Sequence, residues 1–143
     1  MKDISHQLVV LGAGRPYRGE RHSALIPTSG NRRVFDWVIE ATRGLDPNIC
    51  FVSGYRLQEV AREISGVTFA YNPDWEKCGS LSSLLCAPLG DDEYLFVSYS
   101  DIVFRRDVVE LLQASKADVA VAIDPAWRRR YQDRTEEDLR DAE

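Results

Sequence analysis

The chain has 143 residues, of which 44% are hydrophobic and 29% are charged, and its formal net charge is −5 at pH 7. This composition predicts one globular domain with a hydrophobic core, and the acidic balance argues against a protein that binds nucleic acid. Three cysteines without a C-x-x-C pair, in a chain whose start has no apolar signal segment, indicate a reduced, cytoplasmic protein, and no stretch approaches the roughly 20 apolar residues of a membrane span.

Short runs of β-branched and aromatic residues alternate with segments of helical spacing along the chain. The expected strands are residues 8–11, 49–52, 67–71, 94–99 and 119–123. Between them, apolar side chains recur with helical spacing and predict helices over residues 34–41, 57–64, 80–85 and 107–115. This alternation predicts an α/β fold, with a mostly parallel central sheet that is flanked by helices on both faces.

The first expected strand leads directly into a loop rich in glycine and arginine, residues 12–18, which we call the phosphate loop. Gly12 and Gly14 let backbone N–H groups approach an anion closely, and Arg15 and Arg18 add positive charge. The loop lacks the third glycine of the dinucleotide motif and the Lys and Ser/Thr of the P-loop, which argues against a nicotinamide cofactor. The segment therefore predicts another kind of nucleotide loop, although a plain strand-to-loop turn is the alternative.

Ligands of open parallel sheets bind at the carboxyl ends of the strands, where the strand order reverses. With the order 3-2-1-4-5, the first and fourth strands are neighbours, and the phosphate loop lies beside Asp101. The candidate segments that follow the strands are residues 12–18, 53–56, 72–83 and 100–101. We therefore expect an anion-binding loop next to a carboxylate.

Three segments in chain order resemble the nucleotidyltransferases, enzymes that join an NTP to a phosphorylated substrate. They are residues 11–18, residues 22–27, which are similar to the family's P-K-x-L-x-P motif, and residues 97–101, a strand that ends in Asp. Residues 72–75 with 83–84, 99–104 and 124–127 further resemble the cytidylyltransferases of choline phosphate and phosphonate metabolism. Among these, the best resemblance is to the cytidylyltransferase domains fused to phosphoenolpyruvate phosphomutase in fosfomycin biosynthesis.

This resemblance implies a Rossmann-like nucleotidyltransferase domain over residues 1–127 and a charged tail or linker over residues 128–143, which would lead to a mutase domain in a longer chain. Two positions depart from the family pattern. Pro16 stands at the second glycine, and Ser23 stands at the lysine that contacts the α-phosphate. A neutral hydroxyl cannot replace an ammonium group, so nearby arginines or the metal must carry more of the charge, or the enzyme is slow.

The reaction that the resemblance implies is attack of a phosphonate oxygen on the α-phosphorus of CTP, with release of pyrophosphate. The favoured acceptor is 2-hydroxyethylphosphonate; choline phosphate and aminoethylphosphonate are alternatives, as is a nucleotide-binding domain without catalysis. Mg²⁺ is the implied cofactor, with Asp101 as its ligand and Asp124 as a candidate second ligand. Each carboxylate also has a plainer interpretation, Asp101 as a helix cap and Asp124 as a turn residue.

The site residues that follow from these arguments form four sets. The catalytic set is Arg18, Ser23 and Asp101. The nucleotide-binding set is Leu11, Gly12, Ala13, Gly14, Arg15, Ser53, Gly54, Gly79, Ser80, Ser83 and Ser100. The substrate-binding set is Asn72, Trp75 and Trp127, and the metal set is Asp101 and Asp124. Ser80 and Ser83 are expected to read the cytosine base, with a simple helix N-cap as the alternative for Ser80.

Overall fold

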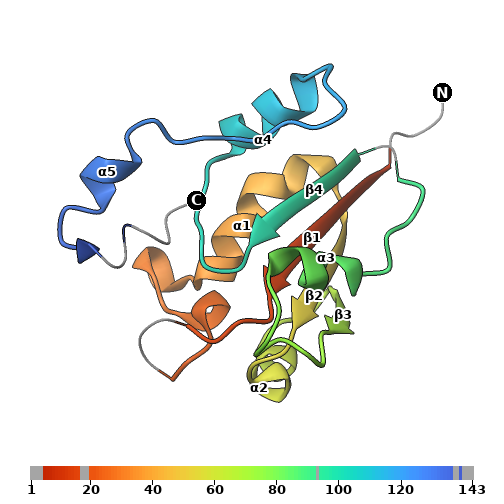
Figure 1. Ribbon diagram of the computed structural model, residues 1–143. Coiled ribbons are helices and arrows are strands. Elements are labelled where there is room, and N and C mark those ends of the chain that lie inside the picture. The colour runs from red at the N-terminus through yellow and green to blue at the C-terminus, as the bar shows by residue number, and fades with distance from the viewer. Residues whose placement is uncertain (1–4, 17–19, 93, 137–138, 140–143) are drawn as a thin grey trace.

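The computed structural model describes residues 5–16, 20–92, 94–136 and 139 (Figure 1). Four parallel strands form one sheet in the order β3-β2-β1-β4. The strands are β1 (His6–Gly12), β2 (Asn48–Ser53), β3 (Thr68–Tyr71) and β4 (Tyr94–Tyr99). The first four predicted strands and their order are therefore confirmed.

Helices cover both faces of the sheet, as predicted. The elements between and after the strands are α1 (Val34–Thr42), α2 (Leu57–Glu63), α3 (Ser80–Leu85), α4 (Arg106–Ala114) and α5 (Trp127–Arg130), with short 3-10 turns η1 (Ser23–Leu25), η2 (Ser29–Asn31) and η3 (Arg43–Leu45). Side chains of α1 and α2 pack on one face, α3 packs on the other, and α4 lies against α1. No helix within the described part of the chain is long and apolar enough to cross a membrane.

The central strand β1 divides its side chains between the two layers of the core. Leu8 and Val10 pack with Phe51 beneath α1 and α2, whereas Val9 packs with Val52 beneath α3. Successive side chains of a strand point to opposite faces, so a central strand covered on both faces needs a continuous apolar run. This requirement explains why residues 8–11 give a clear strand signal without polar alternation.

The predicted fifth strand is absent. Residues 119–123 carry no strand, and their three β-branched side chains are more than three-quarters exposed. Their alternation suits a strand, but a strand also needs a neighbour for its backbone hydrogen bonds, and within the described ranges none lies beside this segment. The edge strand β4 pairs with β1 alone, and Leu95 and Val97 on it are nearly half exposed.

Gly12 ends β1 at a point of very close packing. A Cβ atom on Gly12 would overlap the ring of Phe51 and lie 3.1 Å from Ser100 Cβ, whereas a Cβ atom on Gly14 would meet no atom within 4 Å. Core packing therefore requires a glycine at position 12, because any side chain there would overlap Phe51. It does not require one at position 14, where a side chain would enter open space.

We predict that Gly12→Ala lowers the free energy of unfolding by about 1–3 kcal/mol, because the added methyl group overpacks the core. Gly14→Ala is the matched control, with an expected change within about 0.5 kcal/mol. Urea denaturation of both variants measures the difference. Equal stability of the two variants would show that the approach of Phe51 to Gly12 is no constraint.

Candidate functional site

The loops that follow the four strands meet at one edge of the sheet. Three backbone hydrogen bonds continue the strand pairing into these loops: Ser100 N to Leu11 O at 3.0 Å, Tyr55 N to Ala13 O at 2.9 Å, and Asn72 N to Ser53 O at 2.9 Å. The sheet therefore extends one or two residues into the predicted site. The segments after β1, β2, β3 and β4 are held next to one another in the same order as the strands.

Ser23 and Asp101 lie at the phosphate-loop end of this edge. Ser23 begins the 3-10 turn η1, and its Oγ is 3.3 Å from Ser100 Oγ. Asp101 follows directly, its side chain is exposed, and no described residue donates a hydrogen bond to its carboxylate. The alternative role for Asp101 as a helix cap is wrong, because Arg105 is the N-cap of α4.

The arginines near the phosphate loop differ in how they are paired. Arg15 places its guanidinium over the ring of Tyr55, 5.7 Å from the centroid, and forms no ion pair with a described residue. Arg21 instead pairs with Glu63 of α2 at 3.1 Å. The prediction for Arg18 falls outside the described residues. Arg15 is thus an available cation for a phosphate, whereas the charge of Arg21 is already balanced.

His22 connects the end of β1 to the turn that carries Ser23. Its ring is fully buried; Nε2 donates to the Gly12 carbonyl at 2.7 Å, and Nδ1 accepts from Ala24 N at 3.1 Å. This pattern fits the neutral ring with its hydrogen on Nε2. Burial lowers the pKa of His22 below 6.5, although its contact with Gly12 and the charges of Glu59 and Asp101 oppose the shift. The sequence offered no signal for this role beyond the position directly before Ser23.

Asn72 braces the loop between β3 and α3. Its Nδ2 donates to Ser83 Oγ at 3.0 Å and to Cys78 Sγ at 3.1 Å, and its Oδ1 accepts from Asp74 N at 3.0 Å. The side chain is buried, and both ends of its amide are engaged. Its observed contacts are therefore with its own loop and helix, while its contact with a substrate stays a prediction.

The start of α3 contacts the end of β4 through a pair of hydroxyl groups. Gly79 is the N-cap of α3, and Ser80 Oγ lies 3.0 Å from the hydroxyl oxygen of Tyr99. The alternative interpretation of Ser80 as the N-cap is therefore wrong. Tyr99 is a neighbour of the site that the sequence analysis missed, although its place directly before residues 100–101 could have indicated it.

The two tryptophans predicted for substrate binding lie in different surroundings. Trp75 packs against Gly54, where a Cβ atom would be 2.5 Å from Trp75 Cγ, and meets the ring of Tyr55 edge-on at 5.7 Å. Trp127 begins α5 and packs on Tyr131 at 5.6 Å. In the described part of the chain, no hydrogen bond or ring contact joins Trp127 to the sheet edge. The structure therefore brings Trp75, but not Trp127, to the other site residues.

Asp124 directly follows the segment where the fifth strand was predicted, residues 119–123. Its carboxylate accepts from Arg130 Nε at 2.6 Å and from Ala126 N at 2.9 Å. The hydrogen bond from Arg130 is the main reason why the pKa of Asp124 is lowered. The structure thus places Asp124 in a local turn paired with an arginine, and its role as a metal ligand stays a prediction.

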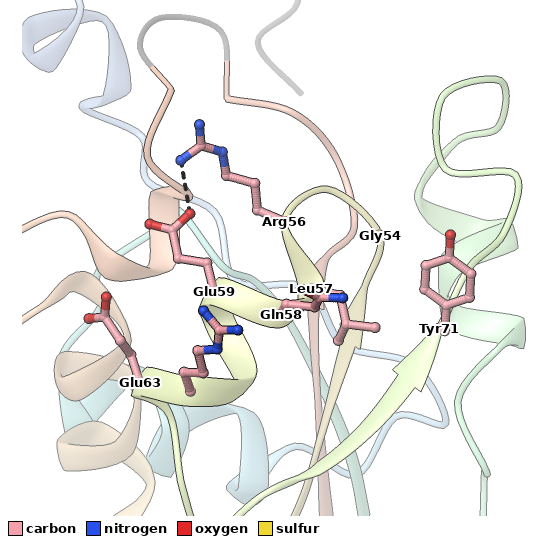
Figure 2. Close-up of a pocket in the computed structure, with 8 residues that line it drawn as sticks. Gly54, Arg56, Leu57, Gln58, Glu59, Glu63 and Tyr71 are labelled. Atoms are coloured by element: carbon pink, nitrogen blue, oxygen red, sulfur yellow. Dashed lines mark hydrogen bonds and ion pairs between the residues drawn. The ribbon is translucent and has the colours of Figure 1, made fainter.

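A groove of about 750 Å³ lies beside the sheet edge, between α2 and the end of β3 (Figure 2). It is lined by Gly54, Arg56, Leu57, Gln58, Glu59, Arg62, Glu63 and Tyr71. Arg56, in the left-handed backbone region at φ 50°, pairs with Glu59 at 3.0 Å. Of the predicted site residues that the structure describes, Gly54 is the one that lines this groove, whereas residues 12–16 of the phosphate loop do not.

The described residues offer a single carboxylate for the magnesium ion that the sequence predicts. Residues 5–16, 20–92, 94–136 and 139 contain no group of three or more His, Cys, Asp or Glu side chains that could hold a metal. Mg²⁺ is usually bound by one or two carboxylates together with substrate phosphates and waters. Asp101, which is exposed beside the phosphate loop and forms no ion pair with a described residue, is a single carboxylate of this kind.

The chain is similar to known cytidylyltransferases and nucleotidyltransferases, although it matches no protein-family profile. The CTP:phosphoglutamine cytidylyltransferase of Campylobacter jejuni is 28% identical in an alignment of 123 residues, and the match covers 79% of this chain and 49% of that protein. A nucleotidyl transferase from Methanothermobacter has a TM-score of 0.62 and 22% identity, covering 76% of this chain and 56% of that one. The CTP:phosphocholine cytidylyltransferase from Streptococcus pneumoniae has a TM-score of 0.57 and 21% identity, covering 73% and 50%.

These matches confirm the predicted Rossmann-like nucleotidyltransferase fold and support the predicted resemblance to the cytidylyltransferases. The chain spans about half the length of the proteins it matches. The activity, substrates and partners of those longer proteins are therefore taken up below as proposals for this chain.

We predict that the protein loses stability through His22 as the pH falls. The unfolded chain protonates this histidine near pH 6.5, whereas the folded protein does so only at lower pH, because burial lowers the pKa. The contribution of the neutral ring is therefore complete above pH 6.5 and is lost as the pH falls through the folded-state pKa. The free energy of unfolding, measured at several pH values below neutral, should fall more steeply for the wild type than for His22→Gln; parallel curves would contradict the assignment.

Proposed function

We propose that this chain is the nucleotide-binding and catalytic part of a cytidylyltransferase, which transfers CMP from CTP to a small phosphonate and releases pyrophosphate. The observation that carries this proposal is the phosphate loop beside Asp101, at the carboxyl ends of the adjacent strands β1 and β4, with Ser23 Oγ 3.3 Å from Ser100 Oγ. The cytidylyltransferase of Campylobacter jejuni, 28% identical, supports CTP as the nucleotide. The resemblance in sequence supports a phosphonate, with 2-hydroxyethylphosphonate favoured.

The proposed reaction is an in-line displacement at the α-phosphorus. A phosphonate oxygen forms a bond to this phosphorus as the bond to the bridging oxygen of the β-phosphate breaks, and pyrophosphate leaves with the electron pair. The phosphonate dianion is already a nucleophile near neutral pH, so no general base is required. Catalysis then consists of positioning and charge neutralisation. Backbone N–H groups of the phosphate loop and the guanidinium of Arg15 supply these functions.

Asp101 and Ser23 complete the phosphate end of the proposed site. Asp101 would hold the magnesium ion, which supplies positive charge to the triphosphate when it is bound. Ser23 would donate a hydrogen bond from Oγ to a phosphate oxygen. Ser23 Oγ lies 3.3 Å from Ser100 Oγ, and its hydroxyl hydrogen would turn from Ser100 toward the phosphate oxygen.

The start of α3 is the proposed site for the cytosine base. Ser83 Oγ accepts a hydrogen bond from Asn72, so its own hydrogen stays available for an acceptor on the ring. Ser80 Oγ and the Tyr99 hydroxyl group form a second polar pair beside it. A site that matches the N4 amine of cytosine leaves polar groups unpaired against uracil, so CTP should bind more tightly than UTP by roughly 1–3 kcal/mol.

The acceptor would lie near Trp75, whose ring is held on Gly54 beside Tyr55. Choline phosphate and aminoethylphosphonate are the alternative acceptors, and a carboxylate or an aromatic cage facing the acceptor would favour a cationic group. Five expectations from the sequence stay predictions: a contribution of Trp127 to the acceptor site, Asp124 as second metal ligand, the tail at residues 128–143, an accompanying phosphomutase domain and a cytoplasmic location.

A second candidate function is nucleotide binding without catalysis. The observation that favours it is Ser23, because this hydroxyl carries no charge where the related enzymes have lysine. Among the arginines of this region that the structure describes, Arg15 is then the one available for the α-phosphate, since Arg21 is paired with Glu63. The two candidates share a CTP site and differ in pyrophosphate release.

Pyrophosphate release tests the proposed function directly. The four NTPs are each combined with 2-hydroxyethylphosphonate, 2-aminoethylphosphonate, phosphocholine and phosphoglutamine, with Mg²⁺ and with EDTA. We expect Mg²⁺-dependent release with CTP and 2-hydroxyethylphosphonate. Release with another acceptor would correct the substrate, CTP binding without release would favour the second candidate, and absence of CTP binding would contradict both.

We predict that Asp101→Ala abolishes Mg²⁺-dependent turnover, because the ion then loses its protein carboxylate. The exposed position of Asp101 predicts that the melting temperature stays close to that of the wild type. Asp107→Ala is a matched control, since Asp107 is also exposed but belongs to α4 and pairs with Arg105. Normal turnover in Asp101→Ala would remove this residue from the site.

We predict that Ser23→Lys keeps or tightens CTP binding, because it restores the positive charge that the related enzymes have at this position. Ser23→Ala should weaken CTP by about 1.5–3 kcal/mol, the value of one hydrogen bond to a charged group. Calorimetric titration with CTP measures both effects. Loss of binding in Ser23→Lys together with unchanged binding in Ser23→Ala would show that residues 22–27 do not follow the path of the related enzymes.

A further inference from the structure

We propose that His22 is a positioning residue for the nucleotide, one that sets the distance between the phosphate loop and Ser23 without touching the substrate itself. This inference rests on the proposed function. It is based on the observation that the two ring nitrogens of His22 form hydrogen bonds with two different segments of the chain. Nε2 donates to the Gly12 carbonyl at 2.7 Å, and Nδ1 accepts from Ala24 N at 3.1 Å.

Both segments carry groups of the proposed site. Gly12 begins the phosphate loop, and Ala24 lies in η1 directly after Ser23, whose Oγ is 3.3 Å from Ser100 Oγ. No backbone hydrogen bond is observed between η1 and β1 among the described residues. The imidazole is therefore the polar connection that holds the turn with Ser23 against the end of β1.

Packing alone does not explain a histidine at this position. The ring is fully buried beside Phe51, with 5.7 Å between the ring centroids, and Phe51 itself belongs to a cluster of apolar side chains. Burying a polar ring is unfavourable unless its nitrogens are paired, so a hydrophobic side chain would fill the space more cheaply. What the histidine adds is direction, since its two hydrogen bonds fix the rotation of the ring and the place of each partner.

The expected consequence is specific to the phosphates. If His22 sets the position of Ser23 relative to the phosphate loop, its loss weakens the contacts to the triphosphate and leaves the base site at α3 unchanged. Cytidine, which has the base but no phosphates, should then bind variants of His22 as well as it binds the wild type. A residue that only supported the fold would affect the two ligands equally.

Two substitutions separate the hydrogen bonds of the ring. Gln can extend an amide N–H group toward the Gly12 carbonyl, as Nε2 does, whereas Asn is too short to reach it and can only accept from Ala24 N. Calorimetry should show CTP affinity reduced about tenfold or more in His22→Asn and cytidine affinity unchanged, because misplacement of a positioning group acts on the contacts it orders. His22→Gln should restore CTP affinity to within about threefold of the wild type.

His6→Asn is the matched control. His6 is also a buried histidine, but it lies on β1 at the end opposite to Gly12 and forms a hydrogen bond with Gln113 of α4. Its substitution should affect stability without changing the ratio of CTP to cytidine affinity. The proposal would be overturned if the ratio of CTP to cytidine affinity fell equally in His6→Asn and in His22→Asn.

Two further results distinguish a failure of the role of His22 from a failure of the proposed function. Wild-type CTP binding with unchanged affinity in His22→Asn overturns the role of His22 and leaves the proposed function standing, whereas absence of CTP binding in the wild type overturns the proposed function. If His22→Asn does not fold, nitrogen NMR of the wild-type ring replaces it. The proposal then expects the Nε2 and Nδ1 shifts to respond to CTP and not to cytidine, and no response to CTP contradicts it.

Discussion

The end of β1 is packed so closely at Gly12 that three other segments are fixed in relation to it. The ring of Phe51 from β2 occupies the space where a side chain would stand, Ser100 lies close by directly after β4, and the imidazole of His22 donates to the carbonyl oxygen at 2.7 Å. Since the backbone of Gly12 also belongs to the sheet, the phosphate loop starts from a rigid position. The proposed nucleotide site depends on this close packing, because it places Ser23, Ser100 and the start of the phosphate loop next to one another.

The sheet is covered more completely around its strands β1 and β2 than at its β4 edge. Around β1 and β2 the core is closed, and Phe51, Leu8 and Val10 are inaccessible to solvent or nearly so. Toward β4 it is open; Leu81 and Leu85 on α3 are 71% and 70% exposed, and Val97 on β4 is nearly half exposed. Strand edges without charged residues or proline are prone to pair with further strands. Residues 119–123 also have no neighbouring strand among the described residues, so their backbone forms no strand hydrogen bonds.

Local patterns in the sequence were sufficient for the elements that pack around β1, because short apolar strands that alternate with amphipathic helices are typical of a parallel sheet. They failed at residues 119–123, since alternation reports the two faces of a segment and not the presence of a neighbouring strand. The meeting of Gly12 with residues 100–101 was predictable from topology. Sequence spacing could not predict the hydrogen bonds of His22, the Ser80–Tyr99 hydrogen bond or the ion pair between Arg21 and Glu63. These contacts depend on side-chain directions, which spacing does not encode.

The central claim is that the phosphate loop, residues 100–101 and the start of α3 form one site for CTP. Amide chemical-shift mapping of the wild-type protein during titration with CTP and Mg²⁺ tests it most directly. The account predicts shifts at residues 12–15, at Ser100 and Asp101, and at residues 79–83, with cytidine moving only the last group. Shifts confined to the α2 groove in Figure 2, or no shifts at saturating CTP, would contradict it.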